Sequence, residues 1–90
     1  MVLAIAYDLH NAGRDYANVI RTIKSAPSAH PQGSFWLIDT TLSPQDWVKK
    51  LQAAGDSNDE YFVTQLKQNW WSLNTDQTTI DWLKSPSRNW

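Results

Sequence analysis

The 90-residue sequence contains no cysteine and carries almost no net charge. Without cysteine the chain can form no disulfide, no thiolate metal site and no cysteine nucleophile, which suits a reducing compartment such as the cytoplasm. Eight Lys and Arg residues against nine Asp and Glu residues give a formal net charge of -1. A globally basic surface is therefore excluded, and any contact with nucleic acid must be local.

Long apolar runs are also missing. The N-terminal run Val2–Ala6 has no basic residue ahead of it and ends at Asp8, which makes it too short for a signal peptide or a membrane span. We expect a strand there, no membrane contact and a cytoplasmic protein. The length fits one domain over residues 1–90, with residues 85–90 as a mobile tail.

Tryptophan is the residue in excess. The six tryptophans, at positions 36, 47, 70, 71, 82 and 90, are more than a domain of this size normally buries. Adjacent side chains on an extended segment point in opposite directions, so Trp70 and Trp71 cannot both enter one core. At least one of them is expected to be exposed, where it can stack on a base, bind a protein, or close a dimer by exchange of the C-terminal segment.

The pattern of apolar and turn-forming residues predicts the strands. Residues 2–7 are apolar without alternation, which is typical of a central strand. Residues 34–40 and 61–66 are rich in β-prone side chains and predict two more strands. The segment 26–33 contains two prolines and a glycine, so it can hold at most a short or edge strand.

Three helices are predicted between these strands. The apolar residues Tyr16, Val19, Ile20 and Ile23 recur at helical spacing and predict a first helix that ends near Ser25. A second helix is delimited by Ser43 and Pro44 at its start and Gly55 at its end. A short third helix begins near Thr75, turns Ile80 and Leu83 inward, and ends before Pro86.

The order of these elements predicts an α+β fold of the ferredoxin-like type, βαββαβ, with a short C-terminal helix added. Two helices would cover one face of a single antiparallel sheet. The other face would then need a cover, and a second copy of the chain related by a twofold axis is the simplest one. We therefore expect a homodimer.

Three segments resemble a known family: Ala6-Tyr7-Asp8-Leu9, Gly13-Arg14-Asp15-Tyr16, and residues 34–40. In this order they are similar to the small SinR-family proteins of bacteria and phages, which are related to the CRISPR-associated Cas-two and VapD proteins. The similarity continues through residues 58–66 and 81–84. The resemblance implies a ferredoxin-like fold, dimerisation through the sheets, and in active members a divalent metal between two symmetry-related aspartates.

Asp8 occupies the position of that aspartate. Two carboxylates brought together across a twofold axis can hold Mg²⁺, activate water and polarise a phosphodiester, so a single chain would be inactive. Ser34, by the same resemblance, would lie near the dimer axis. Asp8 can equally cap the loop that follows it. His10 is interpreted either as a proton shuttle or as a solvated loop histidine.

Four further residues are candidate ligand contacts. Asn11 and Arg14 flank a glycine before the first helix, where free N–H groups can receive a phosphate, although an ordinary strand-to-helix turn has the same sequence. Tyr7 and Trp36 lie in the family-like segments. Trp36 can also be a core residue.

Two functions of different classes follow. The first is a homodimeric Mg²⁺-dependent phosphodiesterase acting on RNA or DNA, with Asp8 from each chain. The second is a non-catalytic dimer that binds a nucleotide, a nucleic acid or a protein in a groove formed by Trp70, Trp71 and residues 26–33, for example a phage protein that sequesters a nucleotide or blocks a defence enzyme. The balanced charge and the tryptophans favour the second. A purely architectural dimer is the third alternative.

Overall fold

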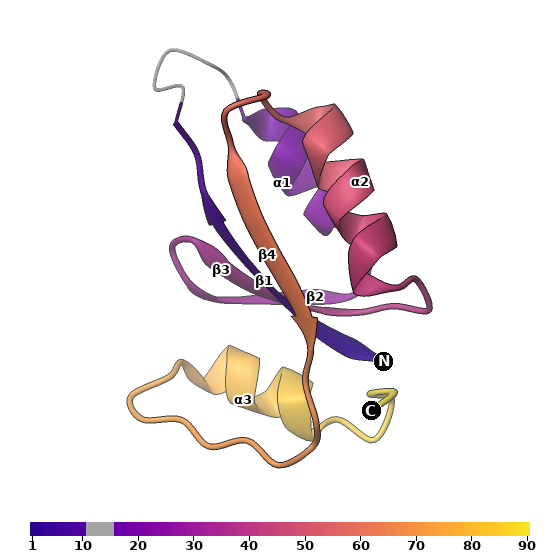
Figure 1. Cartoon of the computed structure of the whole chain (residues 1–90). Helices are drawn as coiled ribbons and strands as arrows, with labels where there is room; N and C mark the ends of the chain where they lie inside the picture. Colours follow the sequence, from indigo (N-terminus) through magenta and orange to yellow (C-terminus); the bar gives the residue numbers. More distant parts are fainter. Residues whose placement is uncertain (11–15) are drawn as a thin grey trace.

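The structure is a computed structural model that describes residues 1–10 and 16–90. In chain order the elements are β1 (Val2–Asp8), α1 (Ala17–Ile23), β2 (Ser28–Gln32), β3 (Phe35–Asp39), α2 (Pro44–Ala54), β4 (Glu60–Gln65) and α3 (Gln77–Lys84). The strands form one antiparallel sheet in the order β2-β3-β1-β4 (Figure 1). The predicted α+β class is thereby confirmed. None of the described helices has the length and apolar character that crossing a membrane requires.

Strand β1 is central, as its unbroken apolar run predicts. It pairs with β3 along one edge and with β4 along the other, so all of its backbone groups can enter the sheet. Strand β2 lies at the sheet edge, and its pairing with β3 shifts register between Ala29 and Gln32. Pro31 falls inside this irregularity, where its missing N–H removes no bond from a central ladder. The prediction of an edge strand is confirmed.

The main core lies between the sheet and two helices, α1 and α2, which pack together on one face (Figure 1). Its buried residues are Leu3, Ile5, Val19, Ile23, Trp36, Ile38, Trp47 and Leu51. Helix α2 begins as its sequence predicts, because the Asp46 N–H donates to Ser43 Oγ at 3.1 Å and Pro44 occupies the first helical position.

The opposite face of the sheet is partly covered by α3 and by the chain that follows it. This smaller core consists of Ala4, Ala29, Leu37 and Leu83, with Trp70, Trp82 and Trp90 among the partly buried residues packed against it. The cover does not extend to the end of the sheet where β1 finishes. There Phe62 is 70% exposed, beside its register partner Ala6. The uncovered face expected from the sequence is therefore only half open.

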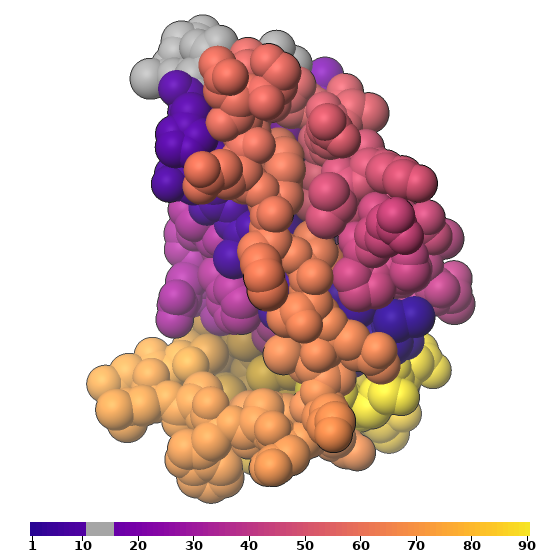
Figure 2. Space-filling view, viewed as in Figure 1, coloured from indigo at the N-terminus to yellow at the C-terminus, as the bar shows by residue number. Residues whose placement is uncertain are grey.

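The tail after α3 is held against the sheet by Asp39. This carboxylate is buried, and its Oδ2 accepts bonds from the Asn89 N–H at 3.0 Å and from the Asn89 side-chain amide at 3.2 Å. Arg88 Nη1 lies 3.6 Å from the same oxygen, and its guanidinium stacks on the Trp82 ring at 4.1 Å. The two chain ends consequently lie close together (Figures 1 and 2). The predicted mobility of residues 85–90 stays a prediction.

Gly55 ends α2 where an added Cβ would overlap the Tyr61 hydroxyl and lie 2.9 Å from Asp59 Oδ2. We expect Gly55→Ala to lower the free energy of unfolding by about 2 kcal/mol, because both neighbours would have to move. Urea denaturation would measure this. Gly33→Ala is the matched control, since its Cβ would meet nothing within 4 Å. Equal stability of the two variants would contradict the close approach at Gly55.

Helix α3 begins at an aspartate N-cap rather than at the predicted Thr75. Asp76 accepts bonds from the Thr79 N–H at 3.0 Å and from the Thr79 hydroxyl at 2.8 Å. These bonds allow Thr79 to be buried, while the predicted inward residue Ile80 is only half-buried. Because the bonds from Thr79 favour the charged carboxylate, they hold the pKa of Asp76 below its usual value.

Because the pKa of Asp76 is lowered, the stability that its charge contributes at the start of α3 depends on pH. A carboxyl group whose folded-state pKa is depressed stabilises the fold above its unfolded pKa of about 4, and this contribution is lost as the pH falls through the folded pKa. Asp76→Asn keeps a good N-cap but removes the charge. We expect the stability difference between wild type and Asp76→Asn, measured by urea denaturation, to shrink as the pH falls from 5 to 2. A constant difference would contradict this role.

Candidate functional site

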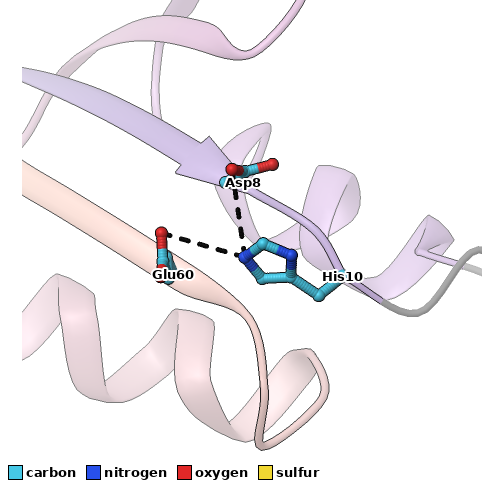
Figure 3. A group of neighbouring side chains, drawn as sticks. All are labelled: Asp8, His10 and Glu60. Carbon is cyan, nitrogen blue, oxygen red and sulfur yellow. Dashed lines mark ion pairs between the residues drawn. The ribbon is translucent and has the colours of Figure 1, made fainter.

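Three ligand-type side chains meet at one end of the sheet (Figure 3). Asp8 is the last residue of β1 and Glu60 the first of β4, and the two are direct register partners. His10 follows two residues after Asp8, and its Nε2 lies 3.9 Å from Asp8 Oδ2 and 3.8 Å from Glu60 Oε2. One ligand atom from each residue lies within 4.8 Å of the others. The arrangement is a candidate metal-binding group.

Electrostatics favour a cation in this group. Like charges directly opposite on antiparallel strands destabilise a sheet, so Asp8 and Glu60 repel each other unless a positive charge lies between them. A protonated imidazole or a divalent ion can supply that charge. Carboxylate oxygens suit Mg²⁺ and Mn²⁺, whereas the imidazole is better matched to softer transition metals. All three side chains are open to solvent, so a hydrated ion can reach them.

Asp59 fixes the backbone of His10 by a hydrogen bond. Its Oδ1 accepts the His10 N–H at 3.0 Å and the Tyr16 hydroxyl at 2.7 Å, and its Oδ2 accepts the Asp56 N–H at 2.7 Å. One carboxylate therefore ties the chain after β1 to the turn before β4 and to the start of α1. The alternative in which Asp8 caps the following loop stays a prediction, because residues 11–15 lie outside the described part of the chain.

Ser34 lies at the same end of the sheet as Asp8. It belongs to the turn between β2 and β3, and its carbonyl accepts the Tyr7 N–H at 3.1 Å. A shallow hollow of about 350 Å³ adjoins this end. It is lined by Ala6, Tyr7, Asp8, Glu60, Tyr61 and Phe62. The two carboxylates thus border a largely apolar hollow whose volume falls within the range of small-molecule sites.

Tyr7 and Trp36 belong to the packing between sheet and helices. The Tyr7 hydroxyl donates to the Gly33 carbonyl at 3.3 Å and accepts from Trp36 Nε1 at 3.2 Å. Trp36 is buried and stacks on His30 with ring centroids 3.8 Å apart. Its packing agrees with the interpretation as a core residue and leaves little of its ring for a ligand. The candidate contacts Asn11 and Arg14 lie outside the described residues.

A second candidate region surrounds the tryptophan pair. Trp71 is 95% exposed and Trp70 is partly buried, as expected for adjacent aromatic residues. The groove predicted between this pair and residues 26–33 corresponds to a hollow of about 280 Å³ that also contacts Pro31 and Gln32. Sequence reasoning missed Glu60 in the first region and Lys84 and Arg88 in the second. The only signal for Glu60 was its place at the start of a predicted strand.

Comparisons with family models, with curated proteins and with solved structures gave no match. The functional interpretation therefore depends on the geometry of these two regions.

Proposed function

We propose that this chain is a homodimeric, divalent-metal-dependent phosphodiesterase that acts on RNA or DNA, with a ferredoxin-like fold similar to that of Cas-two proteins. The observation that carries the proposal is the convergence of Asp8, His10 and Glu60 within 4.8 Å at one end of the sheet. The element order βαββαβ and the antiparallel strand order β2-β3-β1-β4 support the fold. The absence of cysteine supports a cytoplasmic location.

The donor set fits a hard cation. Asp8 and Glu60 would hold Mg²⁺ or Mn²⁺, and the bound ion would polarise a phosphodiester and lower the pKa of a bound water. His10 presents Nε2 to both carboxylates and can take up or release a proton there. The hydroxyl of Ser34, at the same end of the sheet, would donate a hydrogen bond to a phosphate oxygen.

The half-open sheet face supports a dimer. Phe62 is exposed beside the carboxylate pair, and a large apolar side chain in this position is typical of an interface. Two copies meeting through this face would bury Phe62 and bring two Asp8 residues toward a common axis. Asp8 residues from both chains would then hold one metal ion together.

The proposal is tested by incubating the purified chain with end-labelled single-stranded RNA, single-stranded DNA and duplex DNA. Each substrate is tested with Mg²⁺, with Mn²⁺ and with EDTA, and the mass of the protein in solution is measured by sedimentation. We expect a dimer that cleaves at least one substrate only when a divalent ion is present. Cleavage that persists in EDTA, or a monomer that cleaves, would overturn the proposal.

A further inference from the structure

The elements that line the largest hollow of the second region lie near the end of the sheet where β1 begins, away from Asp8 (Figure 1). Its volume is about 410 Å³, which falls within the range of small-molecule sites. The segment after β4, the end of α3 and the C-terminal tail form its walls. Its chemically distinctive lining is three indoles, from Trp70, Trp71 and Trp90, and two cations, Lys84 and Arg88.

The indoles have unequal roles. Trp70 and Trp90 are partly buried and pack against the smaller core, so that core fixes their positions. Trp71 packs on almost nothing, since it is 95% exposed, and its whole ring is open for a planar ligand. Exposed aromatic rings held beside rigid ones form the platforms on which proteins stack nucleobases.

The cations make the hollow suitable for an anion. Lys84 is exposed, whereas the side chain of Arg88 is only 11% exposed and is fixed between Trp82 and Asp39. Asp39 offsets the charge of Arg88, so Lys84 supplies the net positive charge. No Asp or Glu is found among the described residues that line the hollow.

Arg88 is held by charge and ring stacking more than by hydrogen bonds. Within the described part of the chain, its buried Nε and Nη1 atoms have no hydrogen-bond acceptor. Buried donors are nearly always paired in native proteins, and an exception calls for an explanation. For Nη1 the Asp39 carboxylate, 3.6 Å away, is that explanation, and both atoms are buried too deeply for a ligand in the hollow to contact them directly.

We propose that this hollow binds a nucleobase that carries a phosphate group. The base stacks on Trp71 next to Trp70, and the phosphate binds Lys84, the exposed cation of the lining. A bare phosphate would leave the indoles unused, and an uncharged aromatic compound would leave Lys84 without a partner. The ligand can be a free mononucleotide or the unpaired end of a strand. The inference does not depend on the phosphodiesterase proposal, because the two sites share no residue.

The test is a calorimetric titration in EDTA, which removes any contribution from a metal site. The ligands are four nucleoside 5′-monophosphates, the corresponding nucleosides, inorganic phosphate and a 5′-phosphorylated tetranucleotide. We expect saturable binding of at least one phosphorylated ligand with one site per chain. Its nucleoside and inorganic phosphate should each bind at least about tenfold more weakly, because each lacks half of the contacts.

Two variants locate the site. Lys84→Gln should weaken binding of the phosphorylated ligand by about tenfold without affecting the nucleoside, and Trp71→Ala should weaken both by a similar factor. Lys49→Gln on α2 is the control, since it replaces an exposed residue that does not line the hollow. Circular dichroism verifies that each variant is folded.

The outcomes separate the two sources of the ligand. Binding of mononucleotides identifies a free nucleotide, whereas binding of the tetranucleotide alone identifies a strand end. If neither class binds, the inference is wrong. Wild-type affinity in both Lys84→Gln and Trp71→Ala would also overturn it, because binding would then occur elsewhere on the molecule.

Discussion

Asp8→Asn is expected to abolish metal-dependent cleavage while the dimer persists. The amide is a neutral and much poorer ligand, so each chain would lose one of the two carboxylates that it offers to the cation. A bound metal ion typically contributes several kcal/mol to transition-state stabilisation, and each 1.36 kcal/mol is tenfold in rate, so we expect a loss of roughly a hundredfold or more. Initial cleavage rates at saturating Mg²⁺ or Mn²⁺ would measure it.

Stability measurements provide a second readout of the same variant. Because Asp8→Asn removes a repulsion with Glu60, the variant should be slightly more stable than wild type in EDTA, by a few tenths of a kcal/mol. Added Mn²⁺ should raise the melting temperature of wild type but not of the variant. Asp81→Asn, which alters an exposed carboxylate on α3, is the control. Unchanged cleavage in Asp8→Asn would remove Asp8 from the mechanism.

Asp39→Ala is expected to lower the free energy of unfolding by about 3 kcal/mol and to release the tail. The replacement leaves the largely buried Arg88 without its counter-charge, and breaking one side of a buried ion pair is strongly destabilising. It also removes the acceptor of two bonds from Asn89. Urea denaturation gives the stability, and the rate of proteolytic cleavage after Arg88 reports the release of the tail.

Two further variants separate charge from hydrogen bonding at this position. Asp39→Asn keeps an oxygen acceptor for Asn89 but loses the charge that faces Arg88, so we expect an intermediate loss. Asp46→Asn, at the exposed start of α2, should change stability by less than about 0.5 kcal/mol. If Asp39→Ala behaved like Asp46→Asn, the carboxylate would not be holding the tail.

Much of the fold could be predicted because its signals are local. The start of α2 is encoded by two adjacent residues, Ser43 and Pro44. In the structure Ser43 is the N-cap and Pro44 is the first helical residue, which are the positions these residue types generally prefer. The central place of β1 follows from an apolar run with no polar face, and the edge position of β2 follows from Pro31. Each of these depends on residues within one turn or one strand.

The parts that could not be predicted depend on contacts between distant segments. Glu60 joins Asp8 only through the register of β1 with β4, which the sequence pattern does not specify. Asp39 contacts Asn89 across 50 positions, so its role in ordering the tail has no local signature. Lys84 and Arg88 look like ordinary surface residues in the sequence, and only the packing of α3 and the path of the tail after it place them beside the tryptophans.

The place of β1 between two hydrogen-bonded neighbours has a thermodynamic consequence. The seven residues of β1 span about 20 Å between the carboxylate pair and the indole-lined hollow. Because β1 is paired with β3 and with β4, its register cannot shift without breaking hydrogen bonds on both sides. Communication between distant sites needs an element with two alternative arrangements, and a strand locked on both sides offers only one. Asp8→Asn should then leave nucleotide binding at the hollow unchanged, and Trp71→Ala should leave metal-dependent cleavage unchanged, so the two sites would act independently.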